Sequence, residues 1–257
     1  MGAPGQSALQ REGATAVPDE KRDLRLSIVL PAFNEEDNVE SAIAEATAAA
    51  ERLVATHEIV VVDDGSGDNT AGRVREVAGR DGRVRLISHE ENRGYGEALR
   101  SGFLASTLDF VFFTDADLQF DMGELALLLP YAGTVDVVAG YRINRQDTLV
   151  RRINGHAWNL LVRVLFYVPV RDIDCAFKLF DRRVLGDVDI ESVGAMVNTE
   201  LMVKLGRRGA SVVEVGVHHR PRLAGEARGA SLRVIVTAFR EILRMRRRLA
   251  SLDVRER

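Results

Sequence analysis

Short apolar runs alternate with longer stretches of helical periodicity through the first half of the chain. The apolar runs predict buried strands at residues 26–30, 59–62, 84–87 and 110–114. Between them, polar starts followed by spaced apolar residues predict helices at about 39–56, from 69 onward and at 94–104. Strands and helices that alternate at this spacing predict an α/β fold, with a mostly parallel sheet and helices on both faces.

The second half of the chain has a less regular pattern. Strands are expected at 135–140, 177–180 and 212–217, and helices at 151–168, 199–208 and 231–249. Residues 1–23 are rich in Gly, Ala, Pro and charge, and they show no apolar period. We therefore expect a disordered tail over 1–23, one α/β domain over 24–230, and a basic amphipathic helix and tail over 231–257.

Polar clusters follow directly on three of the predicted strands. They are Pro31-Ala32-Phe33-Asn34-Glu35, Asp63-Asp64-Gly65-Ser66 and Asp115-Ala116-Asp117. In mostly parallel sheets, ligands bind beyond the carboxyl ends of the strands. The three clusters are therefore expected to converge on one edge of the sheet, although they come from distant parts of the chain.

The pair Asp115 and Asp117 is the sharpest of these features. Two carboxylates one residue apart are costly without a cation, and Mg²⁺ or Mn²⁺ prefers such oxygen ligands, often together with phosphates. Gln119 adds an amide oxygen two residues further on. The alternative is a solvated acidic turn that caps a helix at Met122. The strand-end position favours the metal site.

The other two clusters are weak on their own. Asp63 and Asp64 open a turn of Asp, Gly, Ser and Asn, the usual residues of an ordinary strand-to-helix connection. Asn34 to Asp37 is equally typical of a helix start. Gly94-Tyr95-Gly96 is only a fragment of a Gly-rich phosphate loop, so a P-loop kinase or a dinucleotide-binding dehydrogenase is disfavoured.

The amino-acid composition narrows the possible classes of protein only a little. Hydrophobic residues make up 46% and charged residues 28%, and the net charge of −3 gives no reason to expect nucleic acid as a partner. The single cysteine, Cys175, excludes an internal disulfide framework and fits a reducing compartment. No signal peptide is evident, and the longest apolar stretch, residues 158–170, is interrupted by polar residues. We expect a cytoplasmic protein that can lie at the inner face of a membrane.

Two apolar stripes bear on contact with a membrane. One comes ahead of a basic segment with five Arg and one Glu at 240–248, and comprises Leu232, Ile235, Val236, Phe239, Ile242 and Leu243. The other comprises Trp158, Leu161, Val162, Leu165 and Phe166. The first stripe can lie on an anionic membrane or pack against the protein core, and the sequence leaves both alternatives open. The second stripe is expected to be able to face lipid.

In order and spacing, these motifs resemble family-2 glycosyltransferases with the Rossmann-like GT-A fold. The resemblance rests on Ser27 to Glu35, Val60 to Ser66, Asn92 to Gly96 and Asp115 to Gln119, and it covers about residues 26–240. The most similar subgroup is dolichol-phosphate mannose synthase with its bacterial polyprenyl-phosphate relatives. The set of motifs in this order is specific, although each motif alone is not.

The resemblance implies roles for matching residues. Contacts with the nucleotide are implied for Pro31, Ala32, Asn34, Glu35, Asp63, Asp64, Gly65, Arg93, Gly94, Asp115, Ala116 and Asp117. The metal ligands are implied to be Asp115, Asp117 and Gln119. A basic loop that would clamp the donor diphosphate or a lipid phosphate contains Arg220, Arg222 and Arg228. In this loop the Ser-Lys pair common in the subgroup is replaced by Ala227-Arg228, which puts the identity of the acceptor in doubt.

The catalytic residues implied by the resemblance are Asp117, Asp174, Glu200 and Arg222. Asp174 lies in a segment expected near the acceptor, but Asp172 and Asp174 can equally pair with arginines on a surface turn. Glu200 can be an acceptor base or a helix N-terminal acid. A base is needed only for a hydroxyl acceptor, because a phosphate acceptor is already anionic.

The expected activity is inverting, metal-dependent transfer of a hexose from a GDP- or UDP-sugar, such as GDP-mannose or UDP-glucose, to a polyprenyl phosphate. One alternative is a family-2 transferase that acts on a saccharide or another hydroxyl acceptor. A second is a non-catalytic nucleotide-sugar-binding or membrane-scaffold protein. A separate membrane protein is an expected partner, because many relatives carry transmembrane helices after the region of resemblance.

Overall fold

The computed structural model describes residues 21–143, 159–166, 168, 170–186, 188–194 and 196–221. Within these residues, seven strands form one sheet in the order β3-β2-β1-β4-β6-β5-β7. The strands are β1 Arg22–Ala32, β2 Val54–Asp63, β3 Val84–Ser88, β4 Phe110–Thr114, β5 Val137–Ile143, β6 Phe177–Asp181 and β7 Val212–His218. The predicted C-terminal helix at 231–249 and most of the predicted N-terminal tail lie outside the described residues.

Most neighbouring strands are parallel, as the sequence pattern predicts. Strands β3, β2, β1 and β4 run parallel to one another, and so do β5 and β7. Strand β6 is antiparallel to both β4 and β5. The start of β6 therefore lies beside the end of β4, with Phe177 opposite Thr114.

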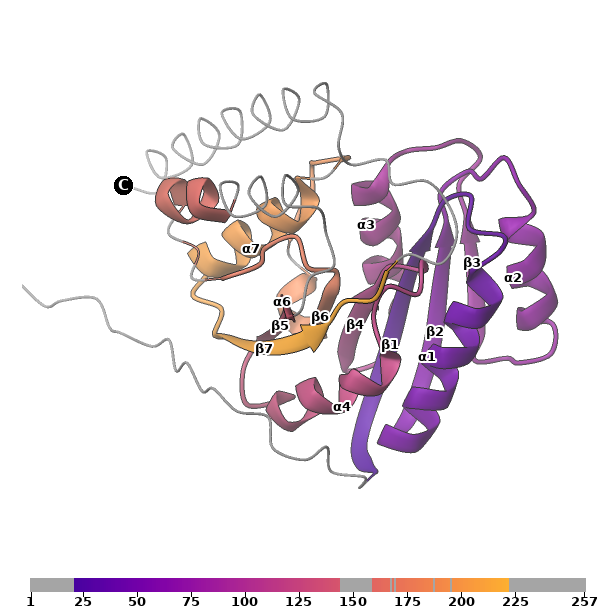
Figure 1. Ribbon diagram of the computed structural model, residues 1–257, viewed down its shortest axis with the longest axis horizontal. Helices are drawn as coiled ribbons and strands as arrows, with labels where there is room; N and C mark the ends of the chain where they lie inside the picture. The colour runs from indigo at the N-terminus through magenta and orange to yellow at the C-terminus, as the bar shows by residue number, and fades with distance from the viewer. Residues whose placement is uncertain are drawn as a thin grey trace, which may run out of the picture.

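Helices cover both faces of the parallel half of the sheet (Figure 1). They are α1 Val39–Leu53, α2 Thr70–Ala78 and α3 Tyr95–Ala105, followed by η1 Met122–Glu124, α4 Leu125–Leu128, η2 Leu129–Tyr131, α6 Arg182–Leu185 and α7 Val197–Arg207. Successive side chains of a strand point to opposite faces. On β1, Val29 faces Gly102 of α3, whereas Leu30 lies beside Ala42 of α1. Helices α1 and α3 therefore cover opposite faces, and α2 packs beside α1.

The predicted end of the first helix was wrong. We expected a helix to about Thr56, but α1 ends at Leu53 and β2 begins at Val54 without a connecting loop. Val54 has φ −133° and ψ 153°, and it pairs with Arg22 of β1. β-Branched Val54 and Thr56 favour this extended backbone, and pairing with β1 stabilises it.

Strand β1 is longer than the predicted apolar run at both ends. It begins at Arg22, and it continues through Pro31 to Ala32 rather than ending before the proline. A proline removes one ladder donor and is normally confined to edges. Here the pairing with β4 ends at Val29, so Pro31 pairs only with β2, opposite Val62.

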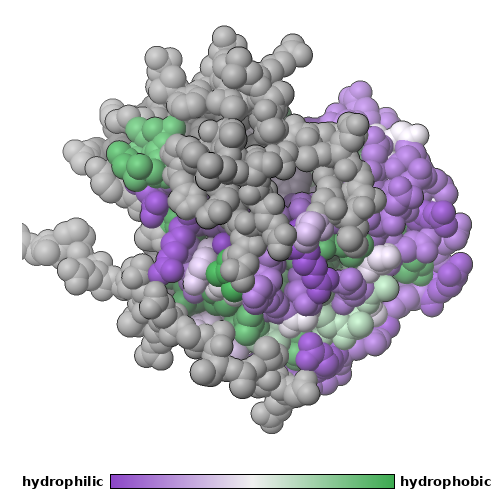
Figure 2. Space-filling view, in the orientation of Figure 1, coloured by the Kyte–Doolittle hydropathy of each residue, from purple (hydrophilic) through white to green (hydrophobic). Residues whose placement is uncertain are grey.

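Helical residues 159–166 correct the expectation for the second apolar stripe. Val162 is fully buried, and Leu161, Leu165 and Phe166 pack against the core, so these residues do not form a lipid-facing surface. Instead, Leu160 is 57% and Val164 62% exposed. Figure 2 shows a hydrophobic patch over this segment. Trp158 lies outside the described residues, and no helix within the described ranges is long and apolar enough to span a bilayer.

Cys175 is the only cysteine of the chain and is fully buried. Burial raises the pKa of its thiol to about 12, so little reactive thiolate forms at neutral pH. We expect native protein at pH 8 to resist iodoacetamide, and protein in 8 M urea to react completely, as measured by mass spectrometry. Alkylation at similar rates in both conditions would contradict the buried position.

Candidate active site

The edge formed by the carboxyl ends of β1, β2 and β4 is where the topology opens a ligand site. From β1 the chain proceeds to β2 and β3 on one side, and it returns to β4 on the other side of β1. The loops after β1 and β4 therefore diverge, which is the switch point where ligands bind in open α/β sheets. The predicted cluster Pro31–Glu35 begins in the last two residues of β1 and continues into the loop after it, and the cluster Asp115–Asp117 follows β4.

The loops after β1 and β2 are joined by reciprocal hydrogen bonds. The amide of Asn34 donates to Ser66 Oγ at 2.9 Å, and the amide of Gly67 donates to Asn34 Oδ1 at 2.8 Å. The amide of Glu35 donates to Thr70 Oγ1 at 2.9 Å. Asn34 adopts a positive φ of 55° to make these contacts. It does not cap α1 as expected, because Asn38 occupies the N-cap position.

The two adjacent carboxylates at the end of β2, Asp63 and Asp64, are both buried, and Asp64 is committed to internal contacts. Its Oδ1 lies 2.7 Å from His89 Nδ1 and accepts the amide of Arg93 at 3.0 Å, while Oδ2 accepts the amide of Gly94 at 2.8 Å. Asp63 Oδ1 accepts the amide of Ser66 at 3.3 Å. Asp64 therefore fixes the loop before α3, and direct contacts of Asp63 and Asp64 with a nucleotide stay predictions.

Gly94 links this loop to the second half of the chain. Its φ is 96°, and a Cβ there would lie 2.4 Å from the carbonyl oxygen of Val193. Only glycine fits this backbone and this close approach. The side chain of the neighbouring Arg93 is exposed beside the same loop. Its exposure is compatible with the predicted contact between Arg93 and a nucleotide-sugar donor.

Asp115 and Asp117 lie at the end of β4, as predicted, and both have protein hydrogen bonds. Asp115 Oδ1 accepts the hydroxyl of Tyr95 at 2.8 Å, and Asp117 Oδ1 accepts the amide of Gln119 at 3.1 Å. Ala116 between them is buried. The acidic-turn alternative is not supported, because the residue that caps the helix at Met122 is Asp121, through the amide of Gly123.

The donor atoms at this edge fit a divalent cation only in part. Asp115, Asp117 and the Gln119 amide supply oxygen ligands of the kind that Mg²⁺ and Mn²⁺ prefer. Within the described ranges, no group of three or more His, Cys, Asp or Glu residues is placed to hold a metal ion. A cation here would therefore be held by two carboxylates together with phosphate oxygens, which is the usual arrangement for Mg²⁺.

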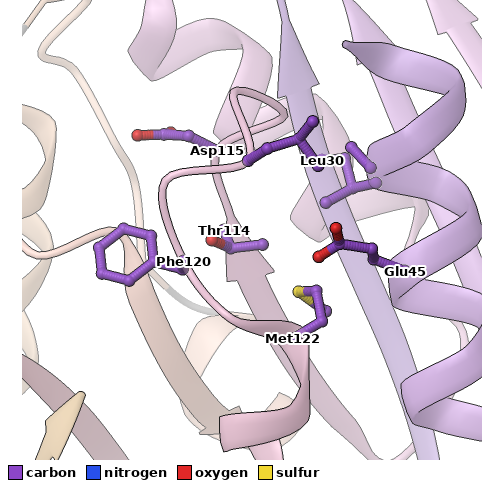
Figure 3. Close-up of a pocket in the computed structure, with 8 residues that line it drawn as sticks. Leu30, Glu45, Thr114, Asp115, Phe120 and Met122 are labelled. Carbon is purple, nitrogen blue, oxygen red and sulfur yellow. The ribbon is translucent and has the colours of Figure 1, made fainter. Parts of the chain in front are cut away.

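A small pocket lies beneath Asp115, between α1 and the end of β4 (Figure 3). It is lined by Leu30, Ala42, Glu45, Thr114, Asp115, Leu118, Phe120 and Met122. Figure 3 shows the Asp115 carboxylate pointing away from the Glu45 carboxylate. The pocket is too small for a sugar nucleotide, so the donor would bind above it, along the loops.

The turn that carries Asp174 is held at the same edge by buried charges. Asp172 accepts two hydrogen bonds from the Arg142 guanidinium, at 2.6 and 2.7 Å. Lys178, which is fully buried, donates to the carbonyls of Ile173 and Cys175. Asp172 therefore pairs with an arginine, as the surface-turn alternative predicted, but this ion pair is buried. Asp174 itself is partly exposed in the turn.

Glu200 lies in the first turn of α7, where its carboxylate binds the preceding loop. It accepts the amides of Glu191 and Ser192, the latter at 2.7 Å, and pairs with Lys204 at 2.6 Å. In the same loop, the carbonyl of Val193 accepts a hydrogen bond from the amide of Gly96 at 3.0 Å. Glu200 therefore has a structural task beside the site, and its role as an acceptor base stays a prediction.

Arg220 is brought next to Gln119, although the two are far apart in sequence. The amide of Arg220 donates to the carbonyl of Gln119 at 2.7 Å, and the Arg220 guanidinium pairs with Asp121 at 2.6 Å and Glu45 at 3.8 Å. Arg220, the first residue of the predicted phosphate clamp, therefore lies beside Gln119, a predicted metal ligand. Arg222 and Arg228 lie outside the described residues.

Sequence reasoning missed two polar residues of this edge. Tyr95 contacts Asp115, and His89 bridges Asp64 and Ser101, with Nε2 lying 2.9 Å from Ser101 Oγ. These partners are 20, 25 and 12 positions away, respectively. No local pattern reports such contacts. The only available signal was that Tyr95 falls between two glycines after a predicted strand.

The sheet order and the carboxylates at the switch point define a GT-A-type α/β domain. The model of the family described as "Glycosyl transferase family 2" matches residues 27–189, and the chain therefore belongs to that family. The predicted family and fold are confirmed.

Curated relatives extend the likeness over most of the chain. The undecaprenyl-phosphate 4-deoxy-4-formamido-L-arabinose transferase of Pseudomonas fluorescens is 33% identical over 217 residues, covering 83% of this chain and 62% of that protein. The enzyme of the same name from Enterobacter sp. is 31% identical over 214 residues, covering 82% of this chain and 64% of that protein. The chain thus spans less than two thirds of the length of these relatives.

Solved structures share the fold at lower identity. Glucosyl-3-phosphoglycerate synthase from Mycobacterium tuberculosis, in complex with Mn²⁺, UDP and glucosyl-3-phosphoglycerate, has a TM-score of 0.68 at 22% identity and covers 86% of this chain and 78% of that chain. Mannosyl-3-phosphoglycerate synthase from Rubrobacter xylanophilus has a TM-score of 0.68 at 22% identity, covering 90% and 75%.

Proposed function

We propose that this chain transfers a sugar from a nucleoside diphosphate to a polyprenyl phosphate at a membrane surface. The observation that carries the proposal is the position of Asp115 and Asp117 at the switch point, joined through Tyr95 and Gly94 to the loop after β2. Membership of family 2 supports sugar transfer. The names of the curated relatives support an undecaprenyl-phosphate type of acceptor.

In this proposal the residues of the edge bind and orient the donor. The loops after β1 and β2 form one rigid wall, because Asn34, Ser66 and Gly67 bond to one another. Asp115, Asp117 and Gln119 would hold Mg²⁺ or Mn²⁺. The cation, when bound, neutralises charge that builds on the leaving diphosphate. Arg220 and the basic loop that follows it would stabilise the same charge.

A phosphate acceptor agrees with the contacts of Glu200. A hydroxyl acceptor needs a base to remove its proton, whereas a phosphate attacks as an anion. The Glu200 carboxylate is buried and already accepts two amides and the Lys204 ammonium. Asp174, in the turn braced by Lys178, would then help to place the acceptor. If the acceptor is a hydroxyl instead, Asp174 is the more accessible candidate base.

The donor sugar is left open within this proposal. We expected a hexose, whereas the curated relatives are named for a formamido-arabinose. The structural neighbour was solved with UDP and Mn²⁺, which supports a uridine nucleotide and manganese as the first choices to test. Localisation at the inner face of the membrane and a separate membrane partner belong to the same proposal.

Two measurements test the proposed function. A thermal-shift screen of UDP-glucose, GDP-mannose and UDP-4-deoxy-4-formamido-L-arabinose, with and without Mn²⁺, should show stabilisation by one donor that requires the metal. That donor, radiolabelled, should then label undecaprenyl phosphate in detergent micelles. Transfer to a saccharide but not to the lipid would favour the hydroxyl-acceptor alternative. Metal-dependent binding without transfer or hydrolysis would favour a non-catalytic binding protein.

A further inference from the structure

Tyr95 contacts the predicted metal site, but the proposed chemistry gives it no task. It is the first residue of α3, and its hydroxyl donates to Asp115 Oδ1 at 2.8 Å. The side chain of Asn198 in α7 lies close to the phenol. Burial, reinforced by the charge of Asp115, raises the pKa of Tyr95 well above its usual value.

The hydrogen bond between Tyr95 and Asp115 has a fixed direction. The phenol has one proton and the Asp115 carboxylate can only accept, so Tyr95 donates to Asp115. Asn198 beside the phenol is buried, so water competes little for this bond.

The backbone on both sides of Tyr95 is held independently of Asp115. The preceding Gly94 amide donates to Asp64 Oδ2 at 2.8 Å, and the following Gly96 amide donates to the Val193 carbonyl at 3.0 Å. Neither contact involves the phenol. Tyr95 is therefore placed by the loops and can orient the Asp115 carboxylate, rather than being oriented by it.

We propose that Tyr95 is a positioning residue for Asp115, and that it sets the rotamer of this carboxylate for metal and nucleotide binding. The inference rests on the proposed function, because it assumes that Asp115 helps to hold a divalent cation with a nucleoside diphosphate.

The test is the affinity for Mn²⁺ in the presence of saturating UDP, measured by electron paramagnetic resonance of free Mn²⁺. Tyr95→Phe removes one oxygen and should weaken Mn²⁺ binding about 10-fold, a typical cost of losing a hydrogen bond to a metal ligand. Asn198→Leu should weaken it less, because the Tyr95 hydroxyl remains. In turnover assays the Mn²⁺ activation constant should rise, while kcat at saturating Mn²⁺ should change less than 3-fold.

Tyr131→Phe is the matched control. Tyr131 ends η2, whose turn packs near Phe110 at the opposite end of β4. It should leave Mn²⁺ binding unchanged. A Tyr95→Phe protein that loses thermal stability but binds Mn²⁺ within 2-fold of wild type would overturn the positioning role and leave the proposed function intact. Wild-type protein that binds no Mn²⁺ with any nucleotide would overturn the proposed function itself, and this inference with it.

Discussion

Asp117→Asn should abolish metal-dependent nucleotide binding and reduce sugar transfer at least about 100-fold, because it removes one of the two carboxylates that would hold the cation, and the cation would neutralise the leaving diphosphate. Asp117 is only 7% exposed and lies directly after β4. Isothermal titration of UDP with and without Mn²⁺ measures the effect. Metal-independent binding of UDP should change little, because the loops after β1 and β2 are untouched.

Asp109→Asn is the control for this experiment. Asp109 directly precedes β4, so it lies at the other end of the same strand, and its side chain is 59% exposed in a loose pair with Arg25. The substitution has the same chemistry and should leave binding and transfer unchanged. If Asp117→Asn retains the Mn²⁺-dependent affinity of the wild type, the assignment of the metal edge is wrong.

Arg142→Met should destabilise the protein by about 3–5 kcal/mol, because it leaves the Asp172 carboxylate buried without its cation. The two side chains are 15% and 8% exposed, and they form paired hydrogen bonds at 2.6 and 2.7 Å. Urea unfolding measures the change. The turn that carries Asp174 should be less well ordered as well, because Asp172 begins that turn.

Two further variants make this result specific. Arg142→Met combined with Asp172→Asn should recover much of the lost stability, because no buried charge is left unpaired. Arg183→Met removes an ion pair in which the arginine side chain is 86% exposed, and it should cost less than about 1 kcal/mol. An Arg142→Met protein as stable as Arg183→Met would show that the buried pair contributes little.

The sequence pattern predicted the bounds of an element most accurately where a continuous run of buried residues makes up the whole element. Phe110–Thr114 was predicted as a strand with the bounds that the structure has. Its five residues are apolar or β-branched, and both of its neighbours in the sheet bury them. The pattern failed at Val54, because the chain changes from helix to strand there without a polar break.

Contacts between distant segments were not predictable in the same way. The family resemblance implied a nucleotide contact for Asp64, and it left Glu200 open as an acceptor base or a helix N-terminal acid. Nothing local in the sequence decided either role. In the structure, Asp64 accepts amides about 30 positions away, and Glu200 binds the loop before its helix. An acid is a ligand or a brace according to which donors the fold brings to it, and periodicity carries no information about those donors.

The sequence by itself determined the strands, the edge at which their polar ends meet and the family to which the chain belongs. Apolar runs report burial, and parallel strands place their carboxyl ends together whatever follows them. Only the tertiary structure decided that β6 runs antiparallel beside β4, that Lys178 is buried beneath the Asp174 turn, and that Tyr95 binds Asp115. These depend on hydrogen-bond partners from remote segments, which become neighbours only when the whole sheet has formed.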